Sequence, residues 1–319
     1  MAILRFNQTN FNFRFLEPHN IKKAMVVSAA LILISIGSLI VQGLNFGLDF
    51  TGGTLVEVGY EQAADLEKIR AQLSAGGYAD AVVQHFGTDK EVLIRLGVHA
   101  DKKNDVLSNE VLALLRADGA TIKMRRAEFV GPQVGKELVE DGGLAILYTL
   151  IGLLIYVTLR FEKRFSVGAV VALVHDSLIT LGFFSLFQWE FDLTVLAAVL
   201  AIIGYSLNDT IVVFDRIRDN FLKLRKGTPT EVMNISINQT LIRTLVTSIT
   251  TLLVVLALFF LGGELIHNFA AALIIGIIVG TYSSIYVASA ITLKLGLTKL
   301  DLMPVEKEGE DMDDLEQMP

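Results

Sequence analysis

The sequence predicts a polytopic α-helical membrane protein with six transmembrane helices and a small ferredoxin-like α+β periplasmic domain. The mean hydropathy is +0.55, and hydrophobic residues make up 52% of the chain. Several apolar stretches reach the roughly 17–25 residues that a helix needs to cross a bilayer. A single polar block, with alternating strand and helix patterns, separates the first of these stretches from the others.

The apolar stretches are predicted to be helices, because a segment in hydrocarbon must satisfy its own backbone and these stretches lack the alternation of barrel strands. They are Lys22–Gln42, Gly142–Leu159, Phe165–Phe187, Leu193–Phe214, Leu245–Leu261 and Ile266–Leu293. The first is long for a signal peptide and lacks a convincing cleavage site, so we expect an uncleaved anchor.

The basic residues of the loops predict the orientation. Lysines and arginines occur before the first span, in Arg160–Arg164, in Arg216–Lys226 and after the last span. Gln188–Asp192 and Gly262–Asn268 contain neither. The positive-inside rule then places both termini in the cytoplasm and residues 43–141 outside.

The predicted organisation has five parts and one cytoplasmic insertion. These are a cytoplasmic N-terminal segment at 1–21, transmembrane helix 1 at 22–42, a periplasmic βαββαβ domain at 43–141, transmembrane helices 2–6 at 142–293 with a cytoplasmic amphipathic segment at 216–242, and a cytoplasmic acidic tail at 294–319. We expect the amphipathic segment to lie along the membrane interface, after a turn at Gly227–Pro229. The tail is expected to be a solvated end, with a docking role as the alternative.

The order of patterns in the periplasmic block is typical of a ferredoxin-like split unit. Strand and helix patterns alternate along the block. They are a strand at Thr54–Gly59, a helix at Ala63–Ala75, strands at Ala81–Phe86 and Glu91–Leu96, a helix at Asn104–Ala117 and a strand at Thr121–Phe129. Such a domain supplies no chemistry by itself.

Asp209, in the fourth span, is the most informative polar residue inside an apolar stretch. Placing a charge there costs at least a few kcal/mol. Burial disfavours the charged form and a nearby cation favours it, so together they allow a carboxyl group to titrate near neutral pH. We interpret Asp209 as a proton relay, with Ser206 and Asn208 beside it. The alternative is a helix-packing acid that stays protonated.

Arg243, early in the helix that becomes the fifth span, is the predicted partner of Asp209. Threonines at helical spacing share its stripe: Thr240, Thr244, Thr247 and Thr251. An arginine on a hydroxyl-lined stripe is expected to face the bundle. Its guanidinium stays charged, so it can act on Asp209 only through its charge and its hydrogen bonds. The alternative is an interfacial anchor whose head group reaches the lipid surface.

His175 and Asp176 form a second polar pair, in the third span. Histidine can carry protons near neutral pH, so this pair belongs either to the proton path or to the packing of the bundle. In the sixth span, Gly276, Gly280, Ser284 and Ala288 form a stripe of small residues that favours close helix packing.

The sequence lacks the motifs of common enzymes. It contains no cysteine, P-loop, zinc motif, nucleophile elbow or dinucleotide fingerprint. We therefore expect no catalytic residue, metal or cofactor, and no nucleic-acid partner. Any work that the protein does must draw its energy from elsewhere.

Several segments resemble the SecD/SecF protein-export family. Residues 47–53 (GLDFTGG) resemble the signature that follows its first span, and residues 129–135 (FVGPQVG) resemble the segment before its second. Residues 204–218 resemble its fourth-span signature, and residues 243–251 the start of its fifth span. The resemblance covers nearly the whole chain, apart from the N-terminal segment and the acidic tail.

This resemblance implies a resistance-nodulation-division fold and a six-helix subunit that pairs with SecD. The family associates with the SecYEG channel and YajC, and uses the proton-motive force to help complete preprotein export across the bacterial inner membrane. Its proton-path acid corresponds to Asp209 and its fifth-span arginine to Arg243. The periplasmic domain would then be the lever that acts on the emerging polypeptide.

Two other functions are compatible with six spans. One is half of a proton-coupled small-molecule exporter, although such exporters usually carry two six-helix halves and larger outer domains. The other is a non-energised scaffold of the translocon. Replacing Asp209 by asparagine separates the scaffold from the motor, because it removes titration and conserves shape.

Overall fold

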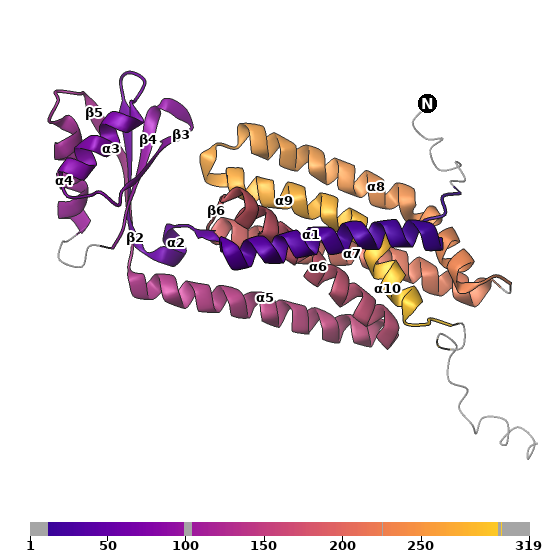
Figure 1. Cartoon of the computed structure of the whole chain (residues 1–319). Coiled ribbons are helices and arrows are strands. Elements are labelled where there is room, and N and C mark those ends of the chain that lie inside the picture. Colours follow the sequence, from indigo (N-terminus) through magenta and orange to yellow (C-terminus); the bar gives the residue numbers. More distant parts are fainter. Residues whose placement is uncertain (1–11, 99–103, 225, 299–300, 302–319) are drawn as a thin grey trace, which may run out of the picture.

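Six helices long and apolar enough to cross a membrane form a bundle in the described part of the chain, and a small α+β domain projects from one end of it (Figure 1). The structure is a computed structural model that describes residues 12–98, 104–224, 226–298 and 301. The predicted fold class is confirmed. The N-terminal residues 1–11, and residues 299–300 and 302–319 of the predicted acidic tail, lie outside the described residues.

The membrane helices extend beyond the apolar windows that predicted them. They are α1 (Pro18–Val41), α5 (Pro132–Arg160), α6 (Lys163–Phe187), α7 (Leu193–Lys223), α8 (Pro229–Leu261) and α9 (Glu264–Ser283), the last continued by the π-turn η2 (Ser284–Ala288) and by α10 (Ser289–Lys294). Proline starts α1, α5 and α8, where its missing N–H costs nothing. A hydropathy window detects only the apolar part of a helix, so polar first and last turns were missed.

The amphipathic segment 216–242 does not form a separate interfacial helix. Its first part continues α7, and its second part is the start of α8, which runs unbroken into the fifth span. A capping box between Thr228 and Glu231 begins α8, and no helix breaker follows it. Asn220 of α7 donates hydrogen bonds to Ser236 and Gln239, both over 2.9 Å, so this part of α8 packs on α7.

The small α+β domain has the predicted order of strands and helices. It consists of β2 (Gly53–Tyr60), α3 (Leu66–Ala75), β3 (Val82–Phe86), β4 (Thr88–Leu96), α4 (Asn104–Arg116) and β5 (Ile122–Val130). The sheet is antiparallel with the order β3-β4-β2-β5. Both helices pack on one face, where Val56, Ile94, Leu73 and Leu107 are buried in one core. We call this unit the ectodomain.

A narrow neck joins the ectodomain to the bundle. The short helix α2 (Leu48–Thr51) precedes β2, and β5 leads directly into α5. Gly52 and Gly53 between α2 and β2 have φ angles of 69° and 131°, which only glycine adopts readily. A Cβ on Gly53 would lie 2.3 Å from the Leu96 carbonyl oxygen, and one on Gly135 would lie 2.6 Å from that of Phe50. Close backbone contacts therefore define the neck.

Two short strands lie at the end of the bundle next to the ectodomain. β1 (Asn45–Phe46) follows α1, and β6 (Glu190–Phe191) connects α6 to α7. They pair in parallel, with Asn45 opposite Glu190. The carboxylate of Asp192 then caps α7 by accepting the Val195 N–H over 2.8 Å.

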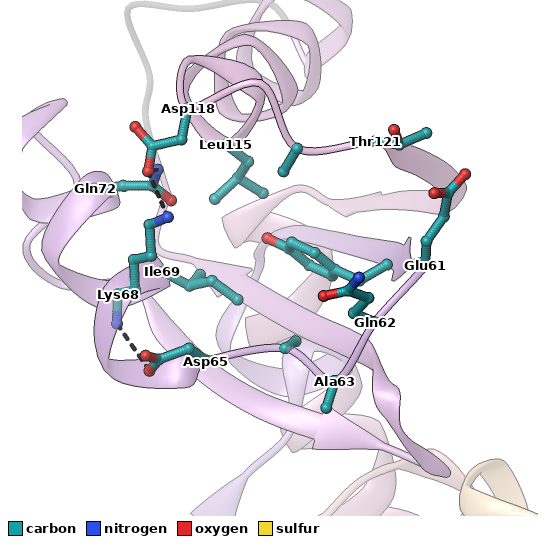
Figure 2. Close-up of a pocket in the computed structure, with 13 residues that line it drawn as sticks. Glu61, Gln62, Ala63, Asp65, Lys68, Ile69, Gln72, Leu115, Asp118 and Thr121 are labelled. Atoms are coloured by element: carbon teal, nitrogen blue, oxygen red, sulfur yellow. Dashed lines mark hydrogen bonds and ion pairs between the residues drawn. The ribbon is translucent and has the colours of Figure 1, made fainter.

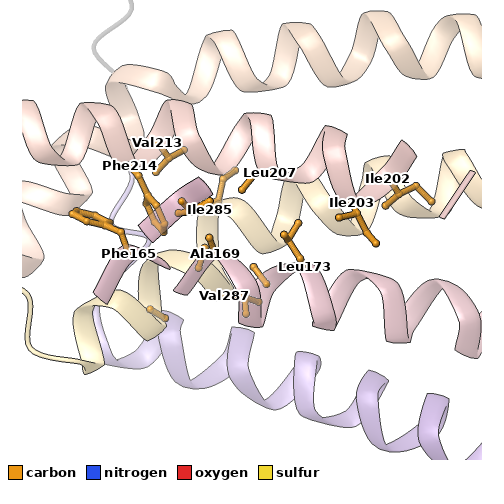
Figure 3. Close-up of a cluster of buried hydrophobic side chains, with 14 of the residues drawn as sticks. Phe165, Ala169, Leu173, Ile202, Ile203, Leu207, Val213, Phe214, Ile285 and Val287 are labelled. Carbon is orange, nitrogen blue, oxygen red and sulfur yellow. The ribbon is translucent and has the colours of Figure 1, made fainter. Parts of the chain in front are cut away.

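The bundle core lies between α6, α7 and the last helical segments. Figure 3 shows Phe165 and Leu173 of α6 facing Leu207 and Phe214 of α7, with Ile285 of η2 beside them. The stripe of small residues lets α9 approach α7, as predicted. A Cβ on Gly276 would lie 2.3 Å from the Ile202 side chain. Close packing thus positions the polar residues of α7 against α9.

Candidate functional site

Asp209 is buried where α7, α8 and α9 meet. Its carboxyl group is bonded at Oδ2 to the hydroxyl of Ser248 of α8, over 3.4 Å. That hydroxyl shares a second hydrogen bond, of 2.7 Å, with Thr281 of α9. Thr281 lies 2.6 Å from the Ile277 carbonyl oxygen. A chain of hydroxyl groups therefore leads from the acid into α9.

Arg243 does not bond to Asp209. Among the described residues, no salt bridge within 4.0 Å involves Arg243, and its side chain is exposed on the surface of the chain. It precedes Ser248 by five residues, which is roughly 7.5 Å along a helix. Ser248 is thus the residue that α8 presents to the acid, while Arg243 stays within electrostatic range of it.

Asp176 is also fully buried and ties three helices together. Its Oδ2 atom accepts hydrogen bonds from Ser206 of α7, over 2.6 Å, and from Ser283 of α9, over 2.7 Å. Its Oδ1 atom lies 2.9 Å from Nδ1 of His175. The tyrosine ring of Tyr282 stacks on His175 at 6.3 Å. The predicted pair therefore forms a polar contact between α6, α7 and α9.

The other predicted site residues divide into two groups. Ser206 is buried and joins the Asp176 network. Asn208 is exposed, because one step along a helix turns it away from the buried face of Asp209. Thr247 bonds only to carbonyl oxygens of its own helix, at Arg243 and Thr244. The structure thus brings Asp176 and Ser206 together, and leaves Asn208 and Thr247 outside both networks.

Three functional candidates were missed by the sequence reasoning: Ser248, Thr281 and Ser283. Ser248 follows the buried Thr244 by four residues, a spacing that puts both hydroxyls on one face. That spacing is the signal that could have identified it. The packing of α8 against α9 determines which hydroxyl of α9 contacts Ser248, and a local sequence pattern does not encode this packing.

Four buried polar atoms near the two acids have no partner among the residues that the structure describes. They are His175 Nε2, Tyr205 Oη, Thr210 Oγ1 and Thr244 Oγ1. Buried polar groups are normally hydrogen-bonded, either to protein or to ordered water.

The ectodomain also has a pocket, between the end of β2, α3 and the loop that follows α4 (Figure 2). Its volume is about 390 Å³, and Tyr60, Ile69 and Leu115 are among its lining residues. At the rim, Lys68 pairs with Asp118 over 2.8 Å, and this contact raises the pKa of Lys68. Glu61 and Asp65 also line the pocket, so it carries three carboxylates and one ammonium group.

These features define a polytopic membrane protein whose helix bundle holds two buried carboxyl groups beneath a small ectodomain. A model of the family "Protein export membrane protein SecD/SecF, C-terminal" matches residues 110–298, and one of the "SecD/SecF GG Motif" matches residues 37–64. The chain belongs to the SecD/SecF protein-export family. The GG motif includes Gly52 and Gly53 of the neck, whose backbone requires glycine.

Relatives of similar length carry one name, "Protein translocase subunit SecF". The protein from Vibrio alginolyticus is 58% identical over 297 residues, which is 92% of this chain and 94% of that protein. The protein from Pseudomonas aeruginosa is 52% identical over 88% of this chain and 91% of its own length. That from Escherichia coli O157:H7 is 44% identical, with 90% of both chains covered. The relatives are thus transport subunits.

Two solved structures extend this similarity to the fold. One is the crystal structure of SecDF, a translocon-associated membrane protein from Thermus thermophilus, with a TM-score of 0.80 and 38% identity over 91% of this chain. The other is SecDF in a "Super-membrane-facing form", with a TM-score of 0.65, 40% identity and 90% of this chain covered. The chain spans 39% of the length of either SecDF chain.

Proposed function

We propose that this chain is the SecF subunit of the Sec preprotein translocase, and that it acts with SecD to help complete protein export across the bacterial inner membrane. The names of its relatives and the translocon-associated SecDF structure support this assignment. SecD, the SecYEG channel, YajC and the translocating preprotein are its proposed partners. Both termini lie in the cytoplasm and the ectodomain in the periplasm, in accord with the basic loops.

The energy for this work comes from protons that bind and leave Asp209. The observation that carries this proposal is the burial of Asp209, 3% exposed, where three helices meet and the Ser248 hydroxyl is the one group among the described residues that is hydrogen-bonded to its carboxyl group. A neutral acid is compatible with such a site, whereas an ionised one calls for a cation or water. Each charge that crosses the membrane releases about 2.3 kcal/mol per 100 mV.

The hydroxyl chain beside Asp209 responds to its protonation state. Each hydroxyl group has one proton to donate. When Asp209 is ionised, Ser248 donates to it and Thr281 donates to Ser248. When Asp209 is neutral, it donates to Ser248, Ser248 donates to Thr281, and Thr281 donates to the Ile277 carbonyl oxygen. A proton on Asp209 therefore reverses the hydrogen bonds that join α7, α8 and α9.

The positive charge of Arg243 favours the ionised form of Asp209. Its guanidinium cannot lose its proton, so it acts on Asp209 through its charge alone. We place it at the end of the proton route rather than in a permanent ion pair, since the two residues are not bonded. The hydroxyls of Thr244 and Thr210 have no partner among the described residues, and they would give bound water polar contacts between Arg243 and Asp209.

For His175 and Asp176, the hydrogen bonds favour a packing role for the acid. Two serine hydroxyls from α7 and α9 already donate to Asp176, so it holds the bundle together in a defined arrangement. The Nε2 atom of His175 has no hydrogen-bond partner among the described residues, so we assign the ring of His175, rather than Asp176, to the proton route. Asp176→Asn should therefore weaken the assembly, whereas His175→Gln should lower proton flux.

The ectodomain is the moving part of this mechanism. It is joined to the bundle by the narrow glycine neck, and a rearrangement of α7 reaches it through β6. The SecDF relatives match this chain with TM-scores of 0.80 and 0.65, which accords with more than one arrangement of this fold. Movement of the ectodomain against the emerging preprotein would turn proton flux into directed export.

Proton flux and export by the reconstituted complex with SecD test the proposal. Asp209→Asn conserves shape and removes titration, so both activities should fall to background. Asp215→Asn is the matched control, because Asp215 lies at the exposed cytoplasmic end of the same helix and pairs with Arg160. Full export by Asp209→Asn would instead identify a scaffold, and small-molecule accumulation in a deletion strain would identify an exporter.

A further inference from the structure

The segment before α1 lies against the first half of α8, at the end of the bundle away from the ectodomain (Figure 1). Asn238 of α8 accepts a hydrogen bond from the N–H of Phe13 over 2.9 Å and donates one to its carbonyl oxygen over 2.7 Å. Asn234, about one turn earlier, accepts a hydrogen bond from the N–H of Leu16 over 2.9 Å. Two asparagine side chains therefore bind the main chain of residues 13–16, which we call the strap.

The strap is also fixed by apolar contacts. The side chain of Leu16 is 1% exposed and belongs to the bundle core. The ring of Phe15 packs edge-on against the ring of Tyr286 in η2, with 5.7 Å between the two centroids. The strap therefore joins the first half of α8 to the π-turn of the sixth span.

The position of α8 depends on contacts that its first half makes. Its buried residues lie between Val232 and Thr244, with two exceptions, Ser248 and Val255. No glycine or proline interrupts the helix after its first residue, so it behaves as one stiff rod. The part of α8 that reaches Asp209 is therefore positioned chiefly from the half to which the strap binds.

The hydrogen bond that this positioning determines is a long one. The hydroxyl of Ser248 donates to Asp209 over 3.4 Å, whereas a hydroxyl donor usually lies about 2.5–3.0 Å from its acceptor. Ser248 follows Asn238 by ten residues, which is roughly 15 Å along a helix. A small rotation or shift of α8 at the strap would therefore be carried to Ser248 and would break this hydrogen bond.

We propose that the strap is a positioning element of the proton relay: by binding Asn234 and Asn238, it places Ser248 at Asp209. The two asparagines are positioning residues, because they act on the relay through Ser248. The inference rests on the proposed proton relay through Asp209, and it assigns a role to the polar first half of α8.

A double-mutant cycle on proton flux through the reconstituted complex with SecD tests this role. The strap variant, Asn234→Ala with Asn238→Ala, should lower the flux about fivefold, because it loosens the contact of Ser248 without removing the hydroxyl. Adding Ser248→Ala should cause no loss beyond the roughly tenfold loss of Ser248→Ala alone, since both changes act on one contact. Losses that multiply to about fiftyfold would indicate general destabilisation and overturn the proposal. Parent flux in the strap variant would also overturn it.

Distances between spin labels measure the position of α8 independently of the flux. The chain contains no cysteine, so labels can be placed at Leu261→Cys, at the last residue of α8, and at Val139→Cys in α5, both exposed positions. Double electron–electron resonance on the full chain with SecD in lipid nanodiscs should give a broader distance distribution for the strap variant than for the parent. Identical distributions would overturn the proposal. The single variants Asn234→Ala and Asn238→Ala should broaden it less, and they replace the double variant if that chain does not fold.

Asn268→Ala is the matched control. Asn268 of α9 donates to the Glu190 carbonyl oxygen over 3.1 Å, so its replacement also removes a hydrogen bond between an amide side chain and the main chain, but next to the ectodomain. This control should keep the parent flux and the parent distances, and a control that behaves like the strap variant would overturn the specific role of the strap. Flux retained by Asp209→Asn would remove the relay, whereas the label distances test the strap on their own.

Discussion

Ser248 of α8 lies 3.4 Å from Oδ2 of Asp209 in α7, and the same hydroxyl shares a 2.7 Å hydrogen bond with Thr281 of α9. One small side chain thus connects the acid to both neighbouring helices. Because a serine hydroxyl has a single proton, it can donate in only one of these directions at a time. Under the proposed proton relay, the protonation state of Asp209 would therefore set the direction of the hydrogen bonds that join the three helices.

Removing this hydroxyl should slow proton flux. Ser248→Ala breaks the chain between Asp209 and Thr281, and a hydrogen bond to a charged group contributes roughly 1.5 kcal/mol or more, so flux should fall about tenfold. Ser248→Thr should retain most of the activity. Thr250→Ala is the control, since that exposed hydroxyl bonds only to carbonyl oxygens of its own helix. Equal fluxes in the alanine variants would contradict the role of Ser248.

Arg243→Lys distinguishes a proton-route residue from an interfacial anchor. Lysine reaches the lipid surface as well as arginine does, so an anchor should tolerate the change. A route that depends on the planar guanidinium should not, because lysine is a compact charge that can lose its proton. We expect membrane insertion to be unchanged and proton flux to fall at least fivefold, roughly 1 kcal/mol. Parent flux in this variant would favour the anchor.

The contact between α7 and α9 should not tolerate a larger residue at Gly276. A Cβ there would lie 2.3 Å from the Ile202 side chain, which is stiff because it branches at Cβ. Overpacking of this kind costs about 1–3 kcal/mol, so Gly276→Ala should lower the melting temperature in detergent. Gly204→Ala in α7 has nothing within 4 Å of the new Cβ and should leave that temperature unchanged.

The neck should be equally sensitive at Gly53. Its φ of 131° is strained for any other residue, and a Cβ would lie 2.3 Å from the Leu96 carbonyl oxygen. Gly53→Ala should therefore loosen the start of β2 and speed limited proteolysis of the ectodomain. Gly43→Ala is the control, because Gly43 has a φ of 69° but open space around it. Similar cleavage of both variants would assign the effect to backbone strain alone.

Local sequence patterns were sufficient to predict the membrane helices, the order of strands and helices in the ectodomain, and the burial of two acidic residues. The reason is physical: hydrocarbon demands long apolar helices, and period-two and period-3.6 patterns reflect burial on one face of a strand or helix. A carboxylate in an apolar helix is conspicuous because it is costly there. Asp209 and Asp176 could therefore be selected without coordinates.

The partners of those acids were decided by tertiary packing. The sequence places Arg243 on a threonine-lined face of α8. The packing of α8 against α7 nevertheless brings Ser248, and not Arg243, into contact with Asp209. Likewise, Ser206 and Ser283 meet at Asp176 although they lie on different helices, and Arg95 contacts Glu190, which lies 95 positions further along the chain. Periodicity specifies which face of a helix is buried. The close approach of two helices, set by residues such as Gly276 and Gly280, determines which side chain of the neighbouring helix contacts that face.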